Sequence, residues 1–461
     1  MKWWLPAVVF VFVLAAQLFL IARIGTDIPY LDEWDVEGSR LYPVWRDGTW
    51  HMSDLFRAHN EHRIFWTRLM DVTLFSVNGQ WDPLVEMAAS ALVRAAGAAF
   101  LVWMLAGGCE MRGRILVAAG VGLAYLPHVA WQNAIWSFQS HTYFVLLFSM
   151  LALAWLGAEE RSRWQLFGGL AAGCAALLSQ GAGAFTPVAL LGLATVRAIE
   201  RRRWDRTLLQ EAWPAALLIA VAFALRAPGL GVVSFYAKTP GQFFNAFGRA
   251  ASWPHTAMPY AAMALNLPLF LAVGLRLARR RRRAAVGENF VLLIGGWAML
   301  AAAALGWSRG GGYEFDAGVT IRYVDFLLLL PVANAWCIVV LVREVNGAQR
   351  SLARLLAGAW GVFLFIGWLG VSAQIIRGFI LPRMRDRDLP VRLAVAYQQS
   401  RDPAVYAPYS GFYQPHINLR SVTVVLDDPR MKSALPPSFQ PGQPMGPLSR
   451  AIRRLRNEVS P

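Results

Sequence analysis

Long apolar runs separated by short polar stretches recur along most of this 461-residue chain. Most runs are about 18–22 residues long, which lets a helix cross a ~30 Å hydrocarbon layer. The pattern predicts an all-α polytopic membrane protein with about 11 transmembrane helices. The expected spans are 3–22, 84–107, 115–131, 140–157, 165–180, 182–197, 208–226, 256–276, 289–307, 324–342 and 355–377.

Composition supports this class and excludes others. Hydrophobic residues make up 56% of the chain and charged residues 16%, and the mean hydropathy is +0.40. A soluble domain usually carries about 25% charged residues, so soluble and disordered classes are excluded. The three cysteines are too few and too poorly placed for a disulfide framework or a cysteine metal site.

The basic charge is distributed in a way that predicts topology. The chain has 44 Lys and Arg against 28 Asp and Glu, and most of the excess lies in short clusters between apolar runs. Such clusters favour the cytoplasmic side, so we read them as orientation signals and not as a nucleic-acid surface. We expect a cytoplasmic N-terminus with an uncleaved first helix, and a periplasmic loop over 23–82.

The run over 165–197 permits two topologies. It is either one long helix or a hairpin broken at Ser179–Gly183. Only the hairpin gathers the arginine clusters on one side, so we predict the hairpin.

Two domains are expected. Residues 1–377 form the transmembrane domain, and 378–461 form a periplasmic tail. This tail holds 12 of the 25 prolines and has little apolar periodicity, so we expect a loosely folded extension.

The densest polar cluster follows the first span. Its four carboxylates lie within six residues: Asp32, Glu33, Asp35 and Glu37. One interpretation is a charged, solvated turn. The other is a catalytic base at the membrane surface, held by Tyr30 and Trp34 at headgroup level.

A second polar cluster lies later in the same loop. His59, Glu61, His62 and Arg63 belong to the stretch H-N-E-H-R. A helix would place the two histidines on one face, where Glu61 could complete a metal site, but this is not a strong zinc spacing. Structural hydrogen bonding and phosphate binding, with Arg63 as the guanidinium fork, are the alternatives. A divalent metal is possible here but not expected, and no cofactor is required.

Two further segments offer candidates for substrate binding. Trp136 and Gln139 lie in an aromatic and amide-rich stretch that reads either as an interfacial belt or as a sugar-stacking surface. Arg309 and the pair Arg322-Tyr323 flank three consecutive glycines. Their arginines pair either with Glu314 or Asp316, or with a lipid-linked phosphate.

Together these residues resemble the GT-C superfamily of polytopic glycosyltransferases. The resemblance rests on the membrane architecture and on four short motifs: Asp32-Glu33 within the D-x-W-D stretch, the H-N-E-H-R stretch, Trp136-Ser137-Phe138-Gln139, and Arg322-Tyr323. The tail is too short for the large periplasmic domain that some GT-C enzymes carry.

The resemblance implies an inverting transfer from a polyprenyl-phosphate-linked sugar to a glycan or lipid acceptor. The reaction would take place at the periplasmic face of a bacterial inner membrane, among membrane lipids. Asp32 is the first candidate for the base and Asp35 the second, while Glu33 would orient a neighbour or the acceptor. Arg309 and Arg322, with Tyr323, then Arg63, would bind the phosphate.

Two other functions remain open at this point. An O-antigen-type polymerase or ligase also handles lipid-linked glycans, although the acidic first loop argues against it. A transporter or flippase would commonly show inverted repeats and charges within its spans. The main charges within a span are Glu86 and Arg94, which we interpret as a structural pair.

Overall fold

The computed structural model describes residues 3–60, 62–107, 109–201, 206–226, 233–279, 286–312, 320–408 and 419–459. Over these residues it is almost wholly helical, with one two-stranded hairpin. Nine helices within the described ranges are long and apolar enough to cross a membrane. The all-α polytopic class is thereby confirmed.

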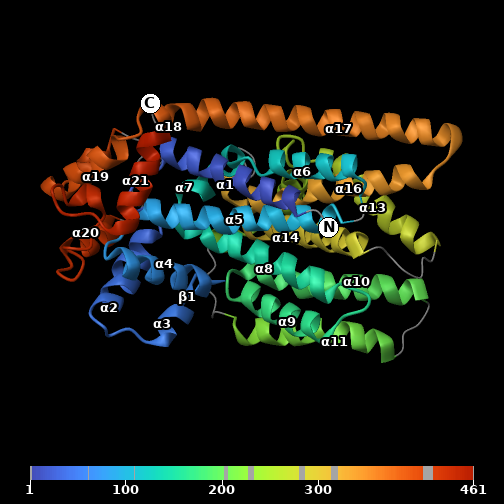
Figure 1. Cartoon of the computed structure of the whole chain (residues 1–461), viewed down its shortest axis with the longest axis horizontal. Coiled ribbons are helices and arrows are strands. Elements are labelled where there is room, and N and C mark those ends of the chain that lie inside the picture. The colour runs from blue at the N-terminus through green and yellow to red at the C-terminus, as the bar shows by residue number, and fades with distance from the viewer. Residues whose placement is uncertain are drawn as a thin grey trace.

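The bundle runs horizontally in Figure 1. Its α-helices are α1 (Trp4–Ile24), α5 (Pro83–Leu105), α6 (Met111–Ala124), α7 (Trp131–Ile135), α8 (Ser140–Leu156), α9 (Arg163–Leu177), α10 (Phe185–Arg201), α11 (Arg206–Ala224), α12 (Pro240–Ala251), α13 (Ala261–Arg279), α14 (Val286–Arg309), α15 (Val324–Leu327), α16 (Leu329–Glu344) and α17 (Gly347–Ile375).

Two expected spans, 165–180 and 208–226, are not among the nine described helices that could cross a membrane. They form α9 and α11, which have 15 and 19 residues. The break predicted near residues 179–183 is confirmed, because a 3₁₀ turn over Gly181–Ala184 separates α9 from α10. Gly183 is required there, since a Cβ would meet the Ala176 carbonyl oxygen at 2.4 Å.

A second layer covers one end of the bundle, at the left of Figure 1. We call it the cap; it comprises residues 25–60, 62–82, 381–408 and 419–459. Its helices and strands are the π-helix η1 (Trp34–Leu41), α2 (Tyr42–Arg46), α3 (Met52–Phe56), β1 (Ala58–His59), β2 (His62–Arg63), α4 (Phe65–Asn78), α18 (Leu381–Arg385), α19 (Leu389–Ser400), α20 (Leu419–Asp427) and α21 (Pro447–Val459).

Local sequence explains where the cap meets the bundle. Gly79, with φ of 69°, ends α4 in the left-handed conformation that glycine adopts without steric cost. Asp82 caps α5 by accepting a hydrogen bond from the Leu84 backbone N–H at 3.1 Å, and Pro83 occupies the first helical position. The chain therefore passes from cap to membrane within a few residues.

The tail differs from the loosely folded extension that its prolines suggested. One buried cluster in the cap combines the first loop with the tail: Trp34, Tyr42, Val72 and Trp81 pack with Leu393, Tyr397, Val425 and Phe439. The apolar residues of the tail gain a core only through this long-range packing, so their local pattern gave no sign of it.

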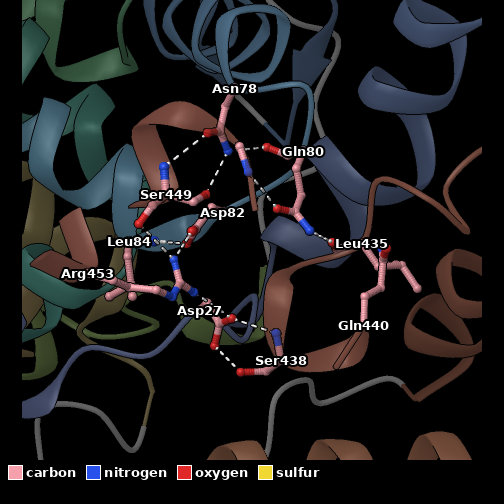
Figure 2. Close-up of polar contacts among 11 residues, drawn as sticks. Asp27, Asn78, Gln80, Asp82, Leu84, Leu435, Ser438, Gln440, Ser449 and Arg453 are labelled. Atoms are coloured by element: carbon pink, nitrogen blue, oxygen red, sulfur yellow. Dashed lines mark hydrogen bonds and ion pairs between the residues drawn. The ribbon is translucent and has the colours of Figure 1, made fainter. Parts of the chain in front are cut away.

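Polar contacts fix the tail on the ends of α1 and α5 (Figure 2). The Arg453 guanidinium bonds Asp27 at 2.9 Å and Asp82 at 2.5 Å. Ser438 donates its backbone N–H and its hydroxyl to Asp27 at 2.8 and 2.7 Å. We call Asp27, Asp82 and Arg453 the clamp.

Candidate functional site

The conformation of the acidic stretch after α1 depends on Leu31, which has a strained backbone, and on Glu33, which is buried and hydrogen-bonded. Leu31 has a φ of 49°, a conformation that costs a side-chain-bearing residue roughly 1–2 kcal/mol. Glu33 is fully buried and accepts hydrogen bonds from the Tyr30 backbone N–H at 2.7 Å, the Ser137 hydroxyl at 2.5 Å and the Phe138 backbone N–H at 3.2 Å. The backbone conformation of Leu31 and the hydrogen bonds of Glu33 therefore fix the position of Asp32, which lies between them in sequence.

The four carboxylates of this stretch have different surroundings. The Asp32 side chain is 39% exposed, whereas Glu33 and Glu37 are buried. The Asp35 carboxylate accepts a hydrogen bond from Ser421 of α20. A π-helix begins at Trp34. Such helices are rare overall, but many of those that occur lie at functional sites. Asp32 is thus partly open to a substrate, whereas Glu33 and Glu37 are enclosed.

His59 lies beside Asp32. Its Nε2 is 3.8 Å from the Asp32 carboxylate, and its ring meets the Phe138 ring edge-on at 5.1 Å. The next residue, Asn60, has a φ of 48° and its side-chain amide is 3.1 Å from His59 Nε2. Non-glycine residues with positive φ thus occur next to both Asp32 and His59, as they do at functional sites generally.

The two histidines lie on a β-hairpin, so the expectation of a helix here is wrong. Ala58 pairs with Arg63 and His59 with His62 across the two strands. Asn60 tolerates the left-handed conformation that a tight turn needs, and this turn chemistry overrides a helical reading. Being directly opposite, the two histidines still share one face.

Other residues of this segment are held by the protein itself. His62 accepts a hydrogen bond from the Gly181 backbone N–H at 3.3 Å. Arg63 donates to the Leu225 and Phe56 carbonyls at 2.8 and 2.5 Å. Glu61 lies outside the described residues. Phosphate binding by these residues stays a prediction, and no group of metal-binding side chains occurs within the described ranges.

A row of aromatic rings extends from His59. Phe138 stacks on Trp136 with ring centroids 5.8 Å apart, and Trp136 meets Tyr30 edge-on at 5.7 Å. We call His59, Phe138, Trp136 and Tyr30 the aromatic row. Gln139, the other sequence candidate of this segment, is buried and accepts a hydrogen bond from Thr142 at 3.3 Å.

Arginines lie near the Tyr30 end of the row. Burial raises the pKa of Tyr30, while the positive charges of Arg383 and then Arg322 act in the opposite direction. Arg322 also lies over the Tyr323 ring at 5.2 Å, and Arg309 donates to the Tyr323 hydroxyl at 2.9 Å. Tyr323 thus joins the two arginines of the sequence prediction; Glu314 and Asp316 lie outside the described residues.

Sequence reasoning did not find Arg383. It lies in α18 within the proline-rich tail, where no motif distinguishes it from the other tail arginines. Its side chain is buried, and only the folding of the tail brings it towards Tyr30.

Behind the row lies a group of buried carboxyls, which we call the acid cluster: Glu33, Glu37, Asp71 and Glu86. Ser137 donates to Glu86 at 2.8 Å, and the Tyr42 hydroxyl donates to the other Glu86 oxygen. Glu86 therefore does not pair with Arg94, which bonds Asp325 at 3.1 Å instead. The expected Glu86–Arg94 pair is wrong, because tertiary packing gives each residue a closer partner.

Burial changes the protonation of the acid cluster. Loss of solvation, followed by the charge of Glu86, raises the pKa of Glu33 to about 8. Burial and then the charge of Asp71 raise the pKa of Glu37 well above its ordinary value, and burial also raises that of Asp71. The buried carboxyls of Glu33, Glu37 and Asp71 therefore favour the protonated form near neutral pH.

Comparisons with known proteins give a distant likeness. No family model matches the sequence, and no curated protein matches it. ArnT from Cupriavidus metallidurans in the apo state is similar over 91% of this chain and 76% of that one, with 17% identity and a TM-score of 0.41. The structure bound to undecaprenyl phosphate gives the same coverage, 18% identity and a TM-score of 0.42.

At these identities and TM-scores the likeness concerns the outline of the helical fold. We therefore interpret the site from its own side chains.

Proposed function

We propose that this chain is a membrane glycosyltransferase that moves a sugar from a polyprenyl-phosphate donor to the hydroxyl of a glycan or lipid-linked acceptor. The observation that carries the proposal is the aromatic row, which has the Asp32–His59 pair at one end and Arg322 and Arg383 towards the other. Such a transfer needs a base, a surface for a sugar ring and cations for a phosphate.

The carboxylate of Asp32 is placed to act as the base. It removes the proton from the acceptor hydroxyl, whose oxygen bonds to the anomeric carbon. His59, with its Nε2 at 3.8 Å, orients the carboxylate. Attack from the side opposite the departing phosphate inverts the anomeric centre.

The arginines serve the leaving group. The bond between the anomeric carbon and the phosphate oxygen breaks, and the oxygen keeps the electron pair. The guanidinium groups of Arg322 and Arg383 stabilise this negative charge, and planar forks suit phosphate oxygens. Arg309 supports the same region through Tyr323.

The layout also fits a lipid-linked donor. The row lies where the cap meets the ends of the membrane helices, because Tyr30 follows α1, His59 lies in β1 of the cap, and Trp136 and Phe138 precede α8. A polyprenyl tail can therefore stay among apolar helices while its head reaches the cap. We place this end of the molecule on the periplasmic side of a bacterial inner membrane, because the basic loops favour the cytoplasm.

The test compares two neighbouring carboxylates. Purified protein in nanodiscs is given a radiolabelled polyprenyl-phosphate sugar, and release or transfer of the sugar is followed. Asp32→Asn keeps the size of the side chain but removes its basicity, so the rate should fall by about 10²–10⁴-fold. Thermal melting should change little, because the side chain is partly exposed.

Asp35→Asn is the matched control. Asp35 lies three residues away and is bonded by Ser421, on the far side of the acidic stretch from the row. Its rate should stay within a few-fold of wild type. Unchanged activity of Asp32→Asn would overturn the proposed base, and loss only in Asp35→Asn would exchange the two roles.

A further inference from the structure

Helix α21 lies across the ends of two membrane helices. Figure 1 shows it almost perpendicular to α1 and α5, at the boundary between bundle and cap. The clamp fixes this position, since Arg453 of α21 bonds Asp27, just beyond α1, and Asp82, the N-cap of α5. A helix at this level and in this orientation lies in the plane of the membrane surface.

The side chains of α21 are arranged around its axis as a packed face with an apolar flank on one side and a basic flank on the other. Ser449 is buried and Ile452 packs on the cluster formed by the ends of α1 and α5. At 100° per residue, Ala451 and Leu455 lie next to Ile452 on one flank, while Arg450 and Arg454 lie on the opposite flank. Leu455 is 51% exposed. One flank therefore suits hydrocarbon, and the other suits water and head groups.

The polar flank is basic. Arg454 is exposed and, among the described residues, neither bonds nor pairs with another side chain. Arg387 pairs with the neighbouring Asp388 at 3.2 Å, where both side chains are partly exposed and such a pair is weak. Burial and then the like charge of Arg387 lower the pKa of Arg456, while the charges of Asp27 and Asp388 act in the opposite direction. An anion near Arg387 and Arg456 would relieve this repulsion.

The net charge of the tail also favours an anionic ligand. Residues 378–461 contain 12 Lys and Arg against 6 Asp and Glu. On the side of the membrane that we assign to the cap, such an excess opposes the usual distribution of basic residues. Topology therefore does not explain this excess. Arg430 and Arg453 pair with aspartates of the protein, but Arg454 needs a separate reason.

We propose that α21 binds the head groups of anionic phospholipids. Leu455 enters the edge of the hydrocarbon layer, Arg454 binds a lipid phosphate above it, and Arg387 with Arg456 binds a second. Apolar contact and charge act together, as in other interfacial helices. The lipid then holds the tail, and with it the cap, on the membrane. This role is independent of the glycosyl transfer.

The experiment measures lipid binding directly. Full-length protein in detergent is titrated with phosphatidylglycerol or phosphatidylcholine, and bound lipids are counted by native mass spectrometry. Phosphatidylglycerol should bind more tightly. Arg454→Gln and Arg387→Gln should each weaken this preference about fivefold, and Leu455→Gln should weaken binding of both lipids. Raising the salt concentration should reduce the arginine effect.

Arg430→Gln is the matched control. Arg430 is also an exposed tail arginine, but it is paired with Asp47 at 2.9 Å and Asp428 at 2.8 Å, away from α21. It should leave lipid binding unchanged. Thermal melting in phosphatidylcholine shows whether each variant is folded.

Three outcomes would overturn the proposal. Equal binding of the two lipids to wild type would remove the head-group preference. An unchanged preference in folded Arg454→Gln and Arg387→Gln would place the lipid elsewhere. If inorganic phosphate alone raised the melting temperature of wild type as much as phosphatidylglycerol does, the site would bind phosphate ions and not lipids.

Discussion

The clamp and the acid cluster both bury carboxyl groups in the cap, but they neutralise them differently. In the clamp, Arg453 stands between Asp27 and Asp82, so opposite charge offsets part of the cost of burial. In the acid cluster, neither Glu37 nor Asp71 forms a salt bridge with a described residue, although the charge of Arg68 acts on Asp71. The nearby Arg68 donates to the Asp54 and Leu55 carbonyls at 3.1 and 3.5 Å instead.

The same chemical group, a buried carboxyl, is therefore used in an ionised form in the clamp and in a neutral form in the acid cluster. Burial raises the pKa of Asp82, but the charge of Arg453 acts against the shift. Burial raises the pKa of Glu37 and Asp71, and at Asp71 the charge of Arg68 opposes the shift without reversing it, so these groups favour the neutral acid form. The clamp depends on its charges, whereas the acid cluster depends on its protons.

Arg453→Met should have the largest effect on stability. It keeps an apolar stem but leaves two buried carboxylates without their cation, which costs about 3–5 kcal/mol. Unfolding in detergent micelles by a denaturant titration measures this. The exposed Arg430, also held by two aspartates, provides the contrast, and Arg430→Met should cost less than about 1 kcal/mol. If Arg453→Met and Arg430→Met lowered the free energy of unfolding equally, burial of the clamp would not increase its contribution to stability.

Tyr42→Phe should have an intermediate effect. The ring keeps its stacking on Phe75 at 4.4 Å, but the Glu86 oxygen loses its donor, which costs about 1–3 kcal/mol. Tyr397→Phe removes a hydroxyl that bonds Thr423 in a partly exposed place and should cost less. The same denaturant titration compares them. A harmless Tyr42→Phe would mean that Glu86 needs no donor.

Glu37→Gln should change the pH dependence of stability. Between pH 4.5 and the raised pKa, the unfolded chain has lost a proton that the folded chain keeps. The unfolding free energy therefore falls as pH rises, by about 1.4 kcal/mol per pH unit for each such group. For Glu33 this window ends near pH 8. Below pH 4 the contribution is fully present.

Removing the Glu37 carboxyl should flatten that slope between pH 5 and pH 8. Asp47→Asn is the control, because hydrogen bonds from Thr49 and Arg430 lower the pKa of this exposed carboxyl, and it is ionised throughout this range. Its slope should match wild type. A Glu37→Gln slope that also matches wild type would show that Glu37 is ionised when folded.

The sequence alone determined the membrane class and much of the helix layout. Long apolar runs have few stable alternatives in a bilayer, because each backbone polar group must be bonded within the segment. The break near residue 181 was also readable, from small residues and from charge. The sequence also drew attention to Asp32, His59 and Trp136, since dense carboxylates, histidines and tryptophans stand out in an apolar chain.

Only the tertiary structure decided which of these residues meet and which are buried. Asp32 and Glu33 are adjacent and both acidic, yet Asp32 is partly exposed beside His59, whereas Glu33 is enclosed by Ser137 and Phe138, which lie 104 and 105 residues away in sequence. The described residues of the tail likewise share one buried cluster with the first loop. Burial and partnership come from contacts distant in sequence, and short local patterns do not encode them.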